Sequence, residues 1–311
     1  MNSQNIGTIL GSATISFCLI SVISQSAQAG TLHNGWNYAI DPNYDSLDSN
    51  NSGGVVAGNT IYEIYGMAIK DDVDTNNIWV AINANLPLTG NNTSSASNGN
   101  IGWGDLFFDF SGLGNFQAAN NSQNVIGVRF APNNDSQTPG IGVYGGVKAV
   151  SVVPQNYGWS NLANHNLYGV LPRTGANAAM GDLAWNDPYY NPYTTIGAWS
   201  QPETLIPNVI QSGTKIGDIS LLNNSDLIAA GFDLGVLPAT GSQTFGFKFD
   251  KSLLPVDKYI ASLFLECNND AIAVVGETQS PKPIPEPSAA IGLVTFGLIF
   301  GANQLRKRYK D

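Results

Sequence analysis

Residues 244–249 read Thr-Phe-Gly-Phe-Lys-Phe, and this short stretch indicates the fold class. The aromatic residues Phe245, Phe247 and Phe249 occupy every second position, with Gly246 and Lys248 between them. Successive side chains of a β-strand point to opposite faces of the sheet. The alternation therefore predicts a half-buried strand with the phenylalanine rings on its inner face.

Short apolar runs of this kind recur from Gly30 to about Gly276, joined by turn-rich links such as residues 71–77, 89–100 and 133–140. Many short strands at modest spacing predict an all-β fold, an antiparallel β-sandwich of jelly-roll-like type with long loops. The stretch 157–211 is the least strand-like, and we expect long loops or short helices there. The other predicted strands are Ile61–Ile69, Ile78–Ile82, Leu106–Phe110, Val125–Phe130, Ile141–Val153, Tyr259–Leu265 and Ala271–Val275.

The composition limits the classes of function that the protein can have. The chain has 311 residues, of which 43% are hydrophobic and only 12% are charged, and its formal net charge is -10. Residues 30–287 carry 9 Lys and Arg against 22 Asp and Glu, so the body is more acidic than the whole chain. Binding to nucleic acid depends on clustered Lys and Arg, so we exclude nucleic-acid partners.

The N-terminal residues have the pattern of a secretory signal. Residues 6–23 are mostly apolar, and Ala27, Gln28 and Ala29 precede Gly30 in the small-x-small order that signal peptidase cleaves. The first basic residue is Lys70, so the usual positive n-region is missing apart from the amino terminus. We predict a signal peptide over 1–29, an exported protein, and Gly30 as the first mature residue.

The C-terminal residues contain a stalk, an apolar segment and a basic tail, in that order. Residues 277–287 are rich in proline, which favours an extended stalk. The apolar run 288–303 spans about 24 Å as a helix, slightly short of the ~30 Å hydrocarbon core. Basic residues after such a helix stay in the cytoplasm by the positive-inside bias. We predict a transmembrane helix with a basic tail over 288–311, the tail residues being Arg306, Lys307, Arg308 and Lys310.

Pro285-Glu286-Pro287, followed by the short apolar segment and the basic cluster, resembles the PEP-CTERM sorting signal of Gram-negative bacteria, including cyanobacteria. The resemblance implies that an exosortase cuts near this motif after transient residence in the inner membrane. The released body would then reach the cell surface or an extracellular matrix, with exopolysaccharide as a partner. The alternative is a permanent anchor that crosses the membrane once.

The body also resembles exosortase-dependent surface proteins, over segments spread along most of the mature chain. This resemblance implies a location in the cell but no particular activity, and it assigns no catalytic residue. The segments are residues 35–40 (Gly-Trp-Asn-Tyr-Ala-Ile), 101–108 (Ile-Gly-Trp-Gly-Asp-Leu-Phe-Phe), 254–256 (Leu-Pro-Val) and 266–270 (Glu-Cys-Asn-Asn-Asp).

Cysteine usage fits export without a disulfide. Cys18 would leave with the signal peptide, so Cys267 is the one thiol of the mature body and has no intramolecular partner. We expect Cys267 to be buried because Leu263-Phe264-Leu265 stands shortly before it.

Catalytic patterns are weak, and we predict a noncatalytic protein. His33 and His165 share no zinc-ligand spacing, and residues 158–162 lack the second glycine of a serine-hydrolase elbow. The glycines of residues 140–145 match a dinucleotide fingerprint, but we expect a strand or bulge there because a strand-like run follows. Asp105 and Asp109 would lie about 13 Å apart on one strand, too far for a glycosidase pair, and we expect them at strand ends facing water. An exported glycan-active hydrolase stays an alternative if acids from different strands converge.

Asp72, Asp74 and Asn76 place oxygen ligands at alternate positions, as calcium loops do. Asn77 and Asn83 stand where an EF-hand has its glycine and its bidentate glutamate, so the EF-hand itself is not supported. The two interpretations are a calcium site and a polar turn between strands. Calcium is the one cofactor that the sequence suggests.

Tyr189, Tyr190, Tyr193 and Trp199 lie among asparagines and prolines. Aromatic faces beside amide groups are suited to holding sugar rings. The second alternative function is therefore a calcium-dependent carbohydrate-binding module. A loop that covers its own aromatic side chains would give the same pattern.

Overall fold

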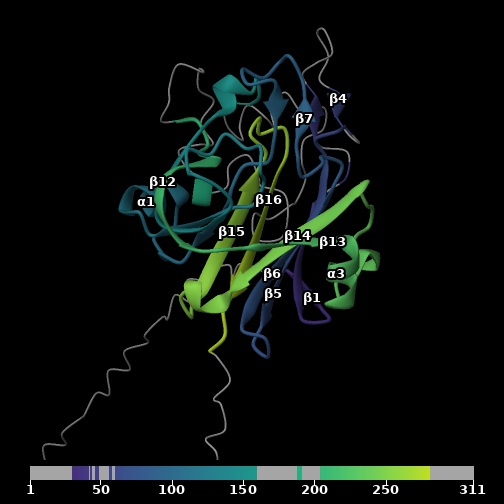
Figure 1. Cartoon of the computed structure of the whole chain (residues 1–311), viewed down its shortest axis with the longest axis vertical. Helices are drawn as coiled ribbons and strands as arrows, with labels where there is room; N and C mark the ends of the chain where they lie inside the picture. The colour runs from purple at the N-terminus through teal and green to yellow at the C-terminus, as the bar shows by residue number, and fades with distance from the viewer. Residues whose placement is uncertain are drawn as a thin grey trace, which may run out of the picture.

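A computed structural model describes residues 30–41, 43, 46–48, 56–57, 60–159, 188–190 and 204–280 (Figure 1). Within these residues no helix has the length and apolar character needed to cross a membrane. The predicted signal peptide, most of the predicted stalk and the predicted transmembrane helix lie outside them.

Two six-stranded antiparallel sheets form the body, which confirms the all-β sandwich. Two small hairpins, β3–β4 (Leu47–Asp48, Val56–Ala57) and β7–β8 (Asn91–Asn92, Asn100–Ile101), complete the described strands. The first sheet has the order β1 (Thr31–His33), β2 (Trp36–Ile40), β5 (Ile64–Asp72), β6 (Asn77–Ala84), β14 (Gln243–Asp250) and β13 (Ser220–Asn223). The second has the order β12 (Val209–Gly217), β11 (Gly142–Val150), β10 (Val125–Arg129), β9 (Leu106–Asp109), β15 (Lys258–Phe264) and β16 (Ala271–Glu277).

The main core lies between the sheets. Phe245, Phe247 and Phe249 are all buried in it, as their alternation predicts. Phe130 of the second-sheet side stacks on Phe247, with ring centroids 5.1 Å apart. Such interdigitation of aromatic rings from facing sheets excludes water from the core and supplies most of the stabilisation of a sandwich.

The outer faces of the sheets are covered as well. The helix α3 (Asn224–Ala229) and the chain after it bury a cluster around Trp36 and Phe232 on the first sheet. The helix α1 (Phe116–Ser122) and the turn η2 (Pro188–Tyr190) cover a cluster around Phe107 and Phe264 on the second. The helices lie on opposite sides of the stacked sheets (Figure 1). Because both faces are buried, several strands are apolar throughout and do not alternate.

Residues 142–145 of the glycine-rich stretch form the start of β11, which confirms the predicted strand and bulge in place of the helix that a dinucleotide fingerprint requires. The pairing of β11 with β12 shifts register between Gly145 and Lys148, where Gly146 has φ of 60°. Ile210 of β12 also packs against Gly127 of β10, where a Cβ would lie 2.7 Å from the Ile210 methyl group. A larger residue at Gly127 would therefore require the Ile210 side chain to shift.

The two ends of the body lie next to each other. The Asn37 side-chain amide donates to the carbonyl of Val275, at 2.8 Å. The oxygen of the same side chain lies 2.6 Å from the position that a Cβ on Gly30 would take. The start of the predicted mature chain and the last strand of the body therefore meet at Asn37.

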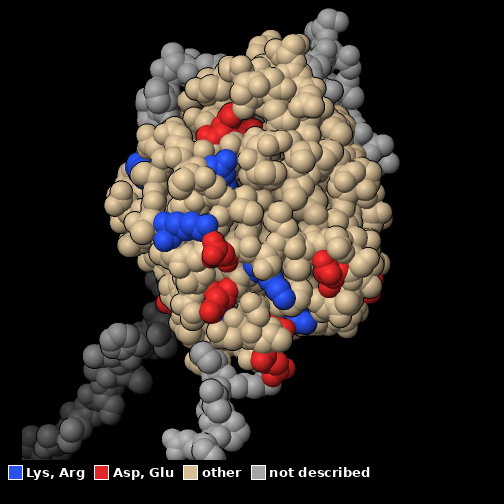
Figure 2. Space-filling model, in the orientation of Figure 1, with Lys and Arg blue, Asp and Glu red and all other residues tan. Residues whose placement is uncertain are grey.

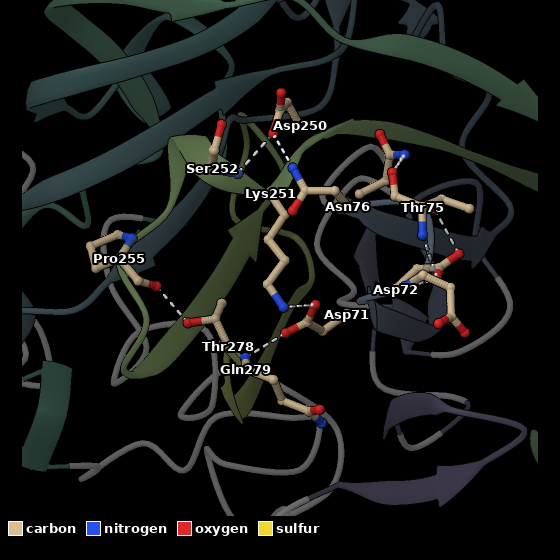
Figure 3. Close-up of polar contacts among 12 residues, drawn as sticks. Asp71, Asp72, Thr75, Asn76, Asp250, Lys251, Ser252, Pro255, Thr278 and Gln279 are labelled. Carbon is tan, nitrogen blue, oxygen red and sulfur yellow. Dashed lines mark hydrogen bonds and ion pairs between the residues drawn. The ribbon is translucent and has the colours of Figure 1, made fainter. Parts of the chain in front are cut away.

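The chain leaves the body through a network of hydrogen bonds at the lower end of Figure 1, which we name the exit anchor: Asp71, Lys251, Thr278 and Gln279 (Figure 3). The Lys251 ammonium contacts one oxygen of Asp71 at 2.5 Å, with the side chains only 3% and 11% exposed. The other Asp71 oxygen accepts the backbone N–H of Gln279 at 2.6 Å. Thr278 donates to the carbonyl of Pro255. The first residues of the predicted stalk therefore belong to the folded body, because Glu277 ends β16 and Thr278 and Gln279 are hydrogen-bonded to it.

Candidate functional site

The described polar residues of greatest interest gather where the loops at the upper end of the sandwich meet the β15–β16 hairpin. Trp103 forms an isolated antiparallel bridge with Leu265, so residues 101–108 and 266–270 lie together. Both are segments that prompted the resemblance to surface proteins. The carboxyl cluster, as we name it, consists of Asp105, Asp135 and Glu266 with the amides of Asn98, Asn134, Asn156 and Asn208.

Glu266 joins separate loops from within the hairpin. Its carboxyl group is buried and accepts the backbone N–H of Gly102 at 2.6 Å and the backbone N–H of Asp135. The pKa of Glu266 is raised to about 8, first by burial and then by the charges of Asp135 and Asp105, against the two backbone hydrogen bonds, which lower it. Its side chain thus fastens the loops before β9 and after β10 to the hairpin.

Asp105 is buried at the start of β9, which corrects the expectation that it faces water. Its carboxyl oxygens accept the Asn134 side-chain amide and the Ile210 backbone N–H, both at 2.6 Å. Burial raises the pKa of Asp105 to about 6, although these hydrogen bonds and the charge of Arg129 lower it. Asp109 is buried too, and it accepts the hydroxyl of Tyr189 at 2.8 Å.

Asparagine side chains complete the cluster. Asp135 accepts the side-chain amides of Asn98 at 2.5 Å and Asn156 at 2.9 Å. The Asn208 amide donates to the carbonyl of Glu266 at 2.9 Å. These asparagine side chains thus connect loops that are distant in sequence through hydrogen bonds, of which the one from Asn208 is buried.

The arrangement uses its carboxyl groups as acceptors of N–H donors from the protein itself. Hydrogen bonds to the charged form stabilise it, whereas burial opposes the charge. Within the described ranges no group of three His, Cys, Asp or Glu residues is arranged to hold a metal ion. Through these hydrogen bonds the carboxyl groups hold together loops that are distant in sequence.

The calcium candidates lie in the turn between β5 and β6, close to the residues of the exit anchor (Figure 3). Asp72 ends β5, and one of its oxygens accepts the backbone N–H of Asp74 at 3.1 Å while the other accepts the Thr75 hydroxyl at 2.8 Å. Asn76 has φ of 55° and donates to Asp250 at 2.9 Å. These contacts account for the pattern as a polar turn between β5 and β6. Calcium binding stays a prediction.

The aromatic candidates lie partly within the described residues. Tyr189 and Tyr190 are buried in the outer cluster of the second sheet, where Tyr190 packs edge-on against Phe264 with centroids 5.4 Å apart. This placement does not support their role as an exposed sugar platform, because their faces cover the sheet. Tyr193 and Trp199 lie outside the described residues.

Among the sorting candidates, Gly30 begins the described body directly before β1. Ala27, Ala29, Pro285, Glu286, Pro287, Arg306, Lys307 and Arg308 lie outside the described residues. Cys267 is buried, as its apolar neighbours predict, and burial raises the pKa of its thiol well above its usual range.

Comparison of the chain with protein-family models, with curated proteins and with solved structures gave no match.

Proposed function

We propose that the chain is an exported, noncatalytic protein of the cell surface or extracellular matrix with a structural or adhesive role. In this proposal a signal peptide over 1–29 directs export and the segment 288–311 holds the protein transiently in the inner membrane. An exosortase then cuts near Pro285-Glu286-Pro287 and releases a sandwich of jelly-roll-like type.

The position of the folded body between the two predicted processing sites is the observation that carries this proposal. β1 begins at Thr31, one residue after the predicted first mature residue. The exit anchor ends at Gln279, shortly before the Pro-Glu-Pro motif. Cleavage at both sites would therefore leave every described strand and its hydrogen bonds in place.

The adjacent ends of the body support the same proposal. Gly30 and Val275 both lie beside Asn37, so tethers at the two ends would leave the body from neighbouring points. The end of the described chain after β16 lies at the lower end of the body in Figure 1, whereas β4 and β7 lie at its upper end. In a tethered precursor the loops would thus face away from the membrane.

The described surface fits contact with hydroxyl-rich polymers better than contact with charged ones. On the face that Figure 2 shows, Lys, Arg, Asp and Glu are sparse among uncharged side chains. Amide and hydroxyl groups form neutral hydrogen bonds with sugar hydroxyls, and scattered apolar residues such as Leu221 and Ile228 add contact area. We propose exopolysaccharide as the surrounding matrix.

The convergence of Asp105, Asp135 and Glu266 from separate loops is the specific observation in favour of a hydrolase. A glycosidase acid must reach the glycosidic oxygen, and its partner must reach the sugar or a water molecule. Asp105 and Glu266 are buried and already accept protein N–H donors. We therefore favour a structural role for these carboxyl groups.

Changing Pro285, Glu286 and Pro287 to alanine tests the proposal in the cells that make the protein. We expect the variant to stay in the membrane fraction, whereas the wild type reaches the surface fraction. The matched control changes Pro281 and Pro283 to alanine, which removes stalk prolines but keeps the motif, and we expect it to be sorted normally. Surface delivery of the Pro-Glu-Pro variant at the wild-type level would contradict the proposal.

A further inference from the structure

Two buried acceptor atoms of the carboxyl cluster lack a hydrogen-bond donor. The Oδ1 atoms of Asn134 and Asn156 are buried without a donor, and the two residues are only 7% and 0% exposed. Their Nδ2 atoms already donate hydrogen bonds, that of Asn134 to Asp105 at 2.6 Å and that of Asn156 to Asp135 at 2.9 Å. Rotating either amide would turn its oxygen toward a carboxylate, so the orientation is fixed by its neighbours.

A carboxylic acid supplies the kind of donor that this cluster lacks. A carboxylate only accepts hydrogen bonds, whereas its protonated form adds one O–H donor and keeps acceptor capacity. Glu266 is buried, and Asp135 and Asp105 both act on it as negative neighbours. We infer that the cluster takes up a proton, held by Glu266, and that this proton makes the attachment of the upper loops to the β15–β16 hairpin sensitive to pH.

The acidic neighbours of Glu266 act in the same direction. Asp135 and Asp105 belong to the loops after β10 and before β9, and both oppose its ionisation. Arg129 acts on Asp105 and lowers the pKa of that acid. The hairpin itself contributes the Cys267 thiol, whose pKa is raised by burial, and the buried Asp270. Ionised Glu266 therefore adds a negative charge where carboxylates already gather.

The direction of the pH effect follows from the pKa of Glu266 in the two states. It rises from an ordinary 4.5 to about 8 on folding. Between these values the folded protein keeps a proton that the unfolded chain releases, so stability falls as the pH rises through this window. The raised pKa of Asp105 also makes stability fall as the pH rises, at lower pH values up to about 6.

Denaturant unfolding of the full chain in mild detergent, at a series of pH values from about 5 to about 9, tests the inference. We expect the midpoint for the wild type to fall with rising pH and the midpoint for Glu266→Gln to stay level above about pH 6. Glu63→Gln, a second buried acid of the body that accepts a hydrogen bond from Ser46, is the matched control and should keep the wild-type slope. Equal slopes for wild type and Glu266→Gln would overturn the inference.

Two further measurements keep the test decisive if Glu266→Gln does not fold. Asp135→Asn removes a charge that raises the Glu266 pKa. The decrease of the unfolding midpoint should therefore occur at lower pH than in the wild type. A decrease at the same pH as in the wild type would overturn the inference. In the wild type, hydrogen exchange at the amides of Gly102 and Asp135 should lose at least about tenfold protection at high pH, after correction for intrinsic exchange. Retention of protection at both amides would also overturn it.

Discussion

Replacing Asp71 by alanine is expected to lower the free energy of unfolding by about 3 to 5 kcal/mol. The substitution leaves the Lys251 ammonium, only 3% exposed, without its carboxylate partner at 2.5 Å. It also removes the acceptor of the Gln279 backbone N–H. Chemical denaturation of the full chain, followed by tryptophan fluorescence, measures the loss.

The neighbouring Asp72 gives the matched control for this prediction. Asp72 is also an aspartate at the end of β5, but its carboxylate caps an exposed turn through Asp74 and Thr75. Loss of such a cap costs about 1 kcal/mol. Equal losses for Asp71→Ala and Asp72→Ala would contradict the role that we assign to the buried ion pair.

A double variant separates the charge from the anchor. Asp71→Ala combined with Lys251→Met removes the buried charges together, and apolar replacement of a buried pair is often close to neutral. Most of the stability should therefore return, while Gln279 still lacks its acceptor. Limited proteolysis should then cut on the N-terminal side of Gln279, where the wild type resists cleavage. Identical cleavage patterns would show that Asp71 does not hold the chain exit.

The second large effect concerns the core between the sheets. Phe247→Ala should lower the free energy of unfolding by about 3 to 5 kcal/mol, because it removes a buried ring and leaves a cavity. Phe247 is fully buried and stacks on Phe130. Leu221→Ala on the adjacent edge strand β13 is the control, since Leu221 is 43% exposed and the change should cost less than about 0.5 kcal/mol.

Equilibrium unfolding of both variants, with the slope against denaturant compared, checks this prediction. An unchanged slope with a lower midpoint for Phe247→Ala would locate the effect in the stability of the folded state. Losses of similar size for Phe247→Ala and Leu221→Ala would contradict the position of the core between the sheets.

The strands that the sequence predicts are those whose burial is visible in their residue types. The run around Phe245 and the apolar run of β15 lie against the core, and their aromatic and branched residues reveal this. In contrast, β12 continues as Gln211-Ser212-Gly213-Thr214-Lys215, which is exposed and polar, so no apolar pattern marks it. Such an edge strand is defined by its partner β11 and not by its own composition.

The carboxyl cluster could not be predicted from local sequence. Glu266 contacts Gly102 and Asp135, which are 164 and 131 residues away in the chain. An acid in a hairpin after an apolar run gives the same local pattern whether it faces water or the interior. The tyrosines at 189 and 190 show the same limit, because an aromatic loop can cover a sheet or a sugar with equal local composition.

The predicted processing signals differ from the carboxyl cluster in this respect, because a processing signal is recognised from the local order of residues. For these residues the two processing sites are predicted from the sequence. The folded body lies between them, since β1 starts at Thr31 and the exit anchor ends at Gln279. The acidic body and the basic C-terminal residues belong to opposite sides of the proposed cleavage.

Intact-mass measurement of the protein recovered from the cell surface tests the account most directly. We predict a chain that begins at Gly30, ends between Pro285 and Ser288, and lacks Arg306 to Asp311. Recovery of the full C-terminus from membranes alone, with no protein in the surface fraction, would contradict it and indicate a protein anchored by a single membrane span.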